Sequence, residues 1–311
     1  MSDERARRWP EPSPEELLKA LRRAGWLLEQ ETATALDAAG FQVTQSWAYQ
    51  DPDEGKSREL DVVGYKELFR DADANLRVSA QVIIECKESD MPYALIGRTT
   101  APSAVPAERN DILAPAERVT YSNEVTPEGR RILYVSAAEY LRLHTLTANP
   151  WARDFEATQL VRLNKSKENW SASNDGIMQD VMAPLSKVLS ILRGEQEAAN
   201  GQWFMNKSAR YSERYPAHLI LYFPLVVTSA PLFKVDATNA PAQVTTAPWV
   251  TLRRRFNSAS LKGTYRATVV NADGLEDYLE SQVLGFANAV AEEVAAKPAR
   301  FVTDRDLSWS R

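Results

Sequence analysis

The sequence predicts a single α/β domain in which a mixed central sheet is flanked by helices. A helical pattern at residues 14–39 precedes three strand-like segments, and a second amphipathic helical pattern covers 175–193. The continuous apolar run at 218–227 is typical of a strand that is buried on both faces. Since helices and strands are interleaved along the chain, the helices are expected to cover the faces of one sheet.

The N-terminal helix has a recognisable start signal. Residues 1–12 are charged and contain prolines, which predicts a loose tail. Ser13 is followed by a proline and, three residues after the cap, by Glu16, which is the pattern of a capping box. Helical periodicity then continues as far as Gly40, which is expected to end the helix. An interruption at Gly25 would give two helices in place of one.

Three strands joined as a meander are expected next. Residues 41–49 alternate between apolar and polar side chains, and a polar loop follows at 50–57. The segments 58–65 and 76–88 also have strand patterns. The order of one helix and three consecutive strands therefore opens the domain.

The rest of the chain is less regular. Five prolines at 89–130 predict irregular structure there, while 157–163 fits no single pattern. The further expectations are a strand at 131–136, a helix at 137–146, a loop at 195–215, strands at 232–235, 249–256 and 265–271, and a helix at 275–296. The predicted organisation is a tail at 1–12 and one domain at 13–311, made of a core (13–90 and about 175–236), an insert (91–174) and C-terminal strands and a helix (237–298).

Composition and charge exclude several classes of function. The 311 residues are 44% apolar and 25% charged, which is ordinary for a protein with a sizeable core. The net charge of −5 argues against coating of nucleic acid through global charge, although it leaves room for a local basic groove. Cys86 is the single cysteine, so neither an intrachain disulfide nor a cysteine-based zinc site is expected. No secretion signal or membrane span is predicted, which favours a cytoplasmic location.

The chemistry is concentrated at the end of the third predicted strand. Glu85 and Lys87 point to the same face of that strand, whereas Ile84 and Cys86 point to the opposite face and into a core. A carboxylate and an ammonium at the end of an apolar strand cost free energy unless they pair with each other or hold an ion.

Two more carboxylates are expected close by. If the second and third strands pair as a hairpin, Asp61 lies across from Glu85, and a divalent cation would relieve the repulsion between them. Mg²⁺ takes a few carboxylate oxygens and completes its octahedron with water and substrate phosphate. Glu29 lies about 20° around the first helix from Leu36 and so borders its apolar stripe, from which it can reach the strand ends. Lys87 is placed to orient or deprotonate an attacking water.

A structural interpretation of the same residues has to be considered. Asp61 can begin a strand as a turn cap, and Glu85 with Lys87 can form a same-face pair on a solvated edge. For an isolated Glu-x-Lys tripeptide that interpretation is the more common one. The ordered context favours the functional interpretation, because a helix with a glutamate at the border of its stripe precedes Leu-Asp-Val-Val and then Val-Ile-Ile-Glu-Cys-Lys.

This ordered set resembles the PD-(D/E)xK nuclease superfamily, with its restriction-endonuclease-like fold. Asp61 matches the motif aspartate, Glu85 and Lys87 match the (D/E)xK element, and Glu29 matches the first-helix glutamate of Mrr-type members; Leu60 replaces the motif proline. The resemblance implies a restriction-endonuclease-like core and hydrolysis of DNA, with all four residues catalytic. It also implies Mg²⁺, or Mn²⁺ in its place, held by Asp61, Glu85 and Glu29, and a homodimer, because two active sites are needed to cut both strands.

Secondary candidates and rival functions remain open at this point. Lys165 and Lys167 follow an apolar stretch, and Arg253 and Arg255 share a face of a predicted strand, so these four are candidate nucleic-acid contacts. For the two lysines a solvated helix or loop is the more common explanation, and for the two arginines a charged edge strand is equally plausible. Two other functions fit the same residues: a nucleic-acid-binding or structural relative without turnover, and a scaffold for protein partners. Among nuclease roles, the sequence does not choose between restriction, phage defence and repair.

Overall fold

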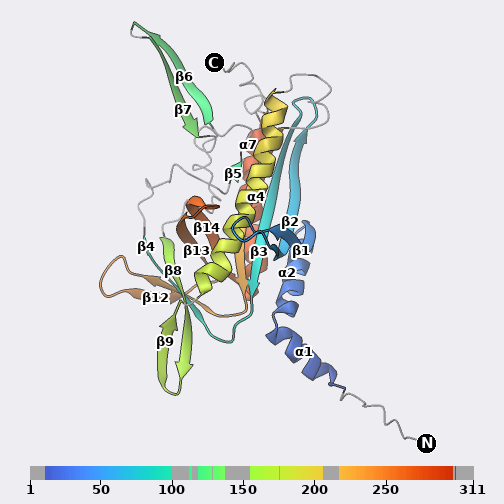
Figure 1. The fold of residues 1–311 in the computed structure, drawn as a ribbon, viewed down its shortest axis with the longest axis vertical. Helices are drawn as coiled ribbons and strands as arrows, with labels where there is room; N and C mark the ends of the chain where they lie inside the picture. Colours follow the sequence, from blue (N-terminus) through green and yellow to red (C-terminus); the bar gives the residue numbers. More distant parts are fainter. Residues whose placement is uncertain are drawn as a thin grey trace, which may run out of the picture.

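The structure, a computed structural model, describes residues 11–99, 112–113, 118–127, 129–136, 155–174, 176–205, 217–296 and 298 (Figure 1). The helical segments of this part of the chain are α1 (Pro14–Arg23), α2 (Trp26–Ala38), α4 (Ile177–Met205), η2 (Ala272–Gly274), α6 (Leu275–Tyr278), the π-helical η3 (Leu279–Leu284) and α7 (Gly285–Ala296). The strands are β1 (Gln42–Gln50), β2 (Ser57–Asp71), β3 (Leu76–Lys87), β4 (Tyr93–Thr99), β5 (Ile112–Leu113), β6 (Arg118–Thr126), β7 (Gly129–Ser136), β8 (Phe155–Ser166), β9 (Asn169–Ser173), β10 (Ala217–Thr228), β11 (Leu232–Asp236), β12 (Gln243–Thr246), β13 (Trp249–Asn257) and β14 (Lys262–Asn271).

The N-terminal helical pattern forms two helices. The capping box is present, because the backbone N–H of Glu16 donates to Ser13 Oγ and the backbone N–H of Ser13 donates to Glu16 Oε2. Gly25 separates α1 from α2 with a φ of 87°, a left-handed conformation that favours glycine. The two-helix alternative is therefore the correct one, and Gly40 ends α2 with a φ of 80°.

The predicted meander is confirmed. β1 pairs with β2 and β2 with β3, both antiparallel. β3 then pairs in parallel with β10 along its whole length, from Leu76 opposite Ala217 to Lys87 opposite Thr228. Every residue of β10 is buried, which agrees with its continuous apolar sequence.

The main sheet is mixed and large. In the described part of the chain it has 12 strands, in the order β1-β2-β3-β10-β14-β13-β8-β4-β11-β12, with β5 paired to β10 and β9 paired to β8. β6 and β7 form a separate antiparallel pair. The sheet contains both parallel pairs, such as β10–β14 and β4–β11, and antiparallel pairs, such as β13–β14 and β4–β8, so the predicted mixed α/β class is confirmed.

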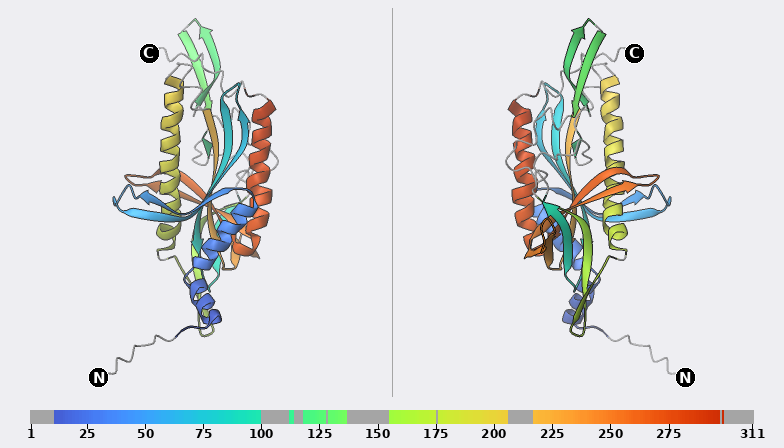
Figure 2. Two further views of the ribbon diagram at one scale, coloured as in Figure 1. Left: turned by 90° about the vertical axis from the view of Figure 1, so that its right-hand side faces the viewer. Right: turned by 90° about the vertical axis from the view of Figure 1, so that its left-hand side faces the viewer.

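Helices cover both faces of this sheet. One apolar cluster joins α2 and the C-terminal helices to one face, through residues such as Leu36, Val62 and Phe286. The other cluster joins α4 to the opposite face, through residues such as Leu185 and Ile83. Figure 2 shows α4 and α7 on opposite sides of the strands. The central strands are thus shielded on both faces, and functional groups are displayed at the strand ends.

Several local predictions differ from the structure. The segment 89–130 was expected to be irregular, but 93–99 is a strand, because β8 and β11, which are distant in the sequence, complete its hydrogen bonds. Residues 118–126 are also a strand, which pairs with the adjacent β7. The expected loop at 195–215 is wrong for 195–205, where α4 continues through good helix formers in spite of its glycines. The open segment 157–163 belongs to β8. The helix predicted at 137–146 lies outside the described residues.

In the described ranges, none of the helices carries an apolar stretch long enough to cross a lipid bilayer.

Candidate functional site

Asp61 lies where strand β2 parts from strand β3. β2 begins at Ser57, but its pairing with β3 begins only at Val62, opposite Ile84. In a regular strand, Leu60 and Val62 would face the same side, yet Leu60 packs in the cluster under α4 and Val62 in the cluster under α2 and α7. The strand is therefore irregular at Asp61, and this carboxylate sits at the fork between β2 and β3.

Glu85 and Lys87 form an ion pair at the end of β3. Lys87 Nζ donates to Glu85 Oε1 over 2.6 Å. Glu85 is only 8% exposed, and its second oxygen, Oε2, is buried without a hydrogen-bond partner among the described residues. Buried polar atoms are nearly always paired, so this oxygen requires a proton, a water molecule or a bound ion.

Asp61 is fixed against the same segment. The backbone N–H of Cys86 donates to Asp61 Oδ2 over 2.6 Å. Cys86 lies between Glu85 and Lys87, so the bond holds the Asp61 carboxylate beside both, as the predicted hairpin requires. The Cys86 side chain points the other way and contacts Thr32 of α2.

Glu29 reaches the site from the first turn of α2. Its side chain is partly buried, and burial raises its pKa. The negative charge of Asp61 raises the pKa of Glu29 further, while the ammonium of Lys87 lowers it. These effects act over short range, so Glu29 belongs to the same electrostatic cluster as Asp61 and Lys87.

The cluster has an excess of negative charge in a buried setting. Burial raises the pKa of Glu85 to about 7, and the nearby carboxylate of Asp61 adds to this shift, whereas Lys87 opposes it. Burial also raises the pKa of Asp61. For Lys87, burial alone would lower the pKa, but Glu85 and Asp61 outweigh it and the pKa is raised. Lys87 therefore keeps its charge, and within this cluster it is one cation beside the three carboxyl groups of Glu29, Asp61 and Glu85.

The carboxylate oxygens of Asp61 and Glu85 are ligands of the kind that a small, hard cation prefers. Asp61 and Glu85 each have one oxygen engaged, by Cys86 N–H and by Lys87 respectively, and the orphaned Glu85 Oε2 is a ready ligand. Mg²⁺ needs only one or two protein carboxylates, since water and substrate complete its shell. As the side chains stand, no three His, Cys, Asp or Glu residues within the described ranges are grouped closely enough to hold a metal ion.

The predicted nucleic-acid contacts lie in two other places. Lys165 is near the tip of the β8–β9 hairpin, with its ammonium 5.6 Å from the ring centre of Trp170, and Lys167 occupies the turn. Arg253 pairs with Glu156 over 3.1 Å, so its charge is partly neutralised within the sheet. Arg255 lies on the same strand and is exposed.

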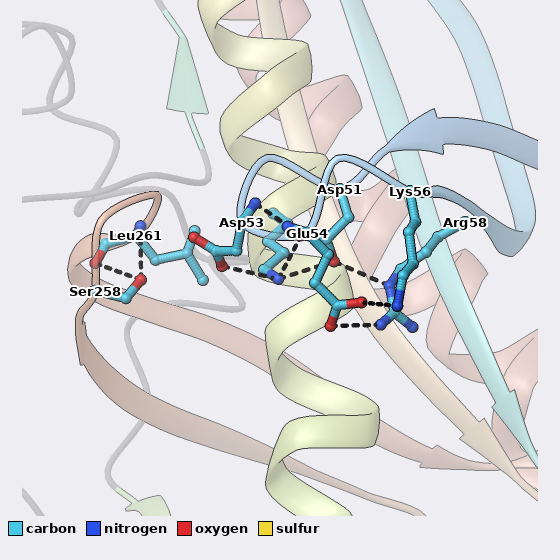
Figure 3. A network of polar contacts seen from close by, with 8 residues as sticks. Asp51, Asp53, Glu54, Lys56, Arg58, Ser258 and Leu261 are labelled. Carbon is cyan, nitrogen blue, oxygen red and sulfur yellow. Dashed lines mark hydrogen bonds and ion pairs between the residues drawn. The ribbon is translucent and has the colours of Figure 1, made fainter.

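A buried ion-pair network between the β1–β2 loop and α4 was not foreseen from the sequence. The β1–β2 loop carries Asp51, which is 2% exposed and accepts hydrogen bonds from Lys187 of α4 over 2.8 and 2.9 Å (Figure 3). Asp53 and Arg58 join the network through Lys187 and Asp51 respectively. The Asp-Pro-Asp-Glu-Gly loop indicates a turn, but nothing in its spacing points to Lys187. The network ties the outer end of the β1–β2 hairpin to the helix on the far face.

Comparisons of this chain with protein-family models, with curated proteins and with solved structures gave no match.

Proposed function

We propose that this chain is a metal-dependent nuclease that hydrolyses phosphodiester bonds in DNA, built on a restriction-endonuclease-like core. The observation that carries the proposal is the meeting of Asp61, Glu85 and Lys87 at one fork in the sheet, with an orphaned buried oxygen on Glu85. The raised pKa values of Asp61 and Glu85 mean that folding disfavours the ionised form of each carboxylate. A buried group of carboxylates with a lysine therefore has no evident role in stability.

The arrangement of elements supports the same proposal. α2, the β1–β2–β3 meander, α4 and β10 follow one another in the order that the resemblance implies, and β10 lies parallel to β3. Three of the residues are on elements that the core holds rigidly, since β3 is paired on both sides and α2 is packed on the sheet. Rigid support of this kind is what a catalytic constellation needs.

The residues divide the work as follows. Asp61 and Glu85 would hold Mg²⁺ or Mn²⁺, with Glu29 holding a ligand water or a second ion. When bound, the ion would supply a water of lowered pKa and stabilise the leaving oxygen. Lys87, held in place by Glu85, orients the attacking water and neutralises charge that develops on the phosphate. For duplex cleavage, two such sites would be brought together in a homodimer.

The test is a cleavage assay with four variants. Plasmid and single-stranded DNA are incubated with Mg²⁺ or Mn²⁺ and wild-type protein, Asp61→Asn, Glu85→Gln, Lys87→Ala or the control Glu280→Gln. Glu280 is an exposed carboxylate on the C-terminal helical segment, so its variant should cut like wild type. The three site variants should lose at least about 100-fold in rate, the lower end of what a positioned acid or base contributes.

Two results would overturn the proposal. Wild-type protein that cuts neither substrate with either ion would exclude the enzyme, and DNA binding without cleavage would favour a relative that lacks turnover. Site variants that cut as fast as Glu280→Gln would show that the cleavage arises elsewhere. Isothermal titration with Mn²⁺ gives a second readout, in which Asp61→Asn and Glu85→Gln should weaken binding and Glu280→Gln should not.

A further inference from the structure

Two tryptophans are unusually exposed for their size. Among the residues whose side chains are described, the exposed aromatic ones are Trp26, at 61%, and Trp170, at 56%. Trp26 begins α2 and stands one turn before Glu29, so the two residues lie on neighbouring parts of the same helix surface. Trp170 lies on β9, directly opposite Lys165 of β8. Neither ring contributes to the two apolar clusters of the core.

The elements that carry the two tryptophans both contact the segment that follows Lys87. A Cβ atom on Gly25 would lie 3.7 Å from the Cβ of Glu88, so the start of α2 packs against the residue after Lys87. A few residues further on, Leu163 N–H donates to Pro92 O over 2.8 Å, which anchors the base of the β8–β9 hairpin. The hairpin and the start of α2 therefore flank the chain as it leaves the carboxylate site.

The figures show the same arrangement at the scale of the molecule. β3 runs towards the end of the molecule from which both α1 and the β8–β9 hairpin project (Figures 1 and 2). From Arg162 to the turn at Lys167, the hairpin extends about 17 Å at roughly 3.3 Å per residue. The hairpin and the end of β3 that carries Glu85 and Lys87 therefore lie towards the same end of the molecule.

The chemistry of the hairpin suits an anionic, aromatic ligand. Arg162, Lys165 and Lys167 are exposed and outnumber the single acidic residue, Glu168. The Lys165 ammonium lies 5.6 Å from the centre of the Trp170 ring, a cation–π distance that keeps a positive charge beside the aromatic surface. Single-strand-binding surfaces combine such features, because bases stack on the ring while the cations follow the phosphates.

Other ligands fit this hairpin less well. A protein-docking surface has an apolar centre, but residues 164–171 contain no aliphatic side chain beside Trp170. In duplex DNA the faces of the bases are covered by their neighbours, so an exposed ring has nothing to stack on except at frayed or unpaired positions. A free ring face beside cations is most useful to a single strand.

We propose that the β8–β9 hairpin, through Trp170 and its basic neighbours, holds an unpaired DNA strand and directs it to the carboxylate site. Single-stranded or locally unpaired DNA is then the substrate class, with Trp26 as a second stacking surface on the opposite flank. The cleavage part of this inference rests on the proposed function, whereas the binding part does not.

The test measures binding without cleavage. Fluorescence anisotropy in EDTA follows a labelled oligothymidine of about 20 nucleotides, longer than common single-strand site sizes, and a duplex of the same length. The protein samples are wild type, Trp170→Ala, Trp170→Phe, Lys87→Ala and the control Val244→Ala, which truncates another exposed apolar side chain on β12.

Wild type should bind the single strand more tightly than the duplex. Trp170→Ala should weaken single-strand binding by between about fivefold and 100-fold, the range for loss of one stacked base, whereas Trp170→Phe should restore most of it. Val244→Ala should bind like wild type. Tighter binding of the duplex, no binding of either DNA, or equal affinity for Trp170→Ala and wild type would overturn the proposal.

The same samples separate this proposal from the nuclease proposal. Single-strand binding that depends on Trp170 but is never followed by cleavage with Mg²⁺ or Mn²⁺ would support the binding surface and exclude the enzyme. Cleavage that requires Lys87 but is unchanged in Trp170→Ala would support the enzyme and exclude the role of the hairpin.

Discussion

The substitution Lys187→Met tests how the β1–β2 loop is held on α4. Lys187 is largely buried, with its side chain 12% exposed, and its Nζ lies 2.8 Å and 2.9 Å from the two oxygens of Asp51 and 2.9 Å from Asp53 Oδ2. Methionine retains the length and the aliphatic contacts of lysine but removes the charge. The carboxylate of Asp51, whose side chain is 3% exposed, then loses its principal cation.

The expected cost follows from what remains around Asp51. Removing one partner of a buried ion pair typically costs about 3–5 kcal/mol, because the other charge stays buried. Here Arg58 still lies 3.0 Å from Asp51, and the backbone N–H groups of Asp53 and Glu54 still donate to it. Those contacts reduce the expected loss of unfolding free energy to about 2–3 kcal/mol.

Urea unfolding of the wild type and four variants measures this value. The control is Lys56→Met, because Lys56 is 75% exposed and its ion pair with Glu54 should be worth less than about 1 kcal/mol. Asp51→Asn and the double variant Asp51→Asn/Lys187→Met complete a cycle, in which the double variant should lose clearly less than the sum of the single losses. If Lys187→Met costs no more than Lys56→Met, or if the losses are additive, the loop is not held by this pair.

Two further predictions concern stability. Burial alone would raise the pKa of Asp51, but the bonds from Lys187 and from the N–H groups of Asp53 and Glu54 outweigh it and hold that pKa at about 2. Because folding lowers the pKa of Asp51, its contribution to stability is present above about pH 4 and is lost as the pH falls towards 2. The urea midpoint of the wild type should therefore fall more steeply with acidification than that of Asp51→Asn. Parallel curves for the two proteins would contradict this assignment. Gly97→Ala should destabilise the protein by about 1–3 kcal/mol or more, because the new Cβ would lie 2.1 Å from the carbonyl oxygen of Glu156. Gly194→Ala, in open space on α4, should instead stabilise the protein by up to about 1 kcal/mol. Equal thermal midpoints for the two variants would refute the argument.

Local patterns were sufficient to predict that Asp61, Glu85 and Lys87 lie close together. Strand alternation alone places Glu85 and Lys87 on one face with Cys86 on the other, and a hairpin between the strands brings Asp61 alongside. The spacing from the apolar stripe of α2 predicts that Glu29 borders that stripe, and Glu29 is indeed partly buried and close enough for the charges of Asp61 and Lys87 to shift its pKa. These relations depend on the periodicity of side chains in strands and helices and on the pairing of strands that are consecutive in the chain, and both can be read from the sequence.

Long-range pairings were not accessible in the same way. Lys187 meets Asp51 across 136 residues, and each is an ordinary charged residue within its own segment. β4 and β8 were missed or left open, because their strand character depends on each other and on β11 and β13. At Asp61 the strand is irregular because Leu60 packs on one face of the sheet and Val62 on the other. The alternation of side chains along a single strand does not predict this.

The position of β10 bears on how a newly made chain reaches its folded state. All four proposed catalytic residues have left the ribosome long before β10 begins at Ala217, yet β3 needs that strand to complete its hydrogen bonds along one whole edge. During this interval the nascent β3 presents an apolar, unpaired edge that can associate with other chains. A truncated product that ends before β10 would contain all of these residues and still lack the neighbour that keeps them in place, so translation of the C-terminal half is a condition for the site at the N-terminal end.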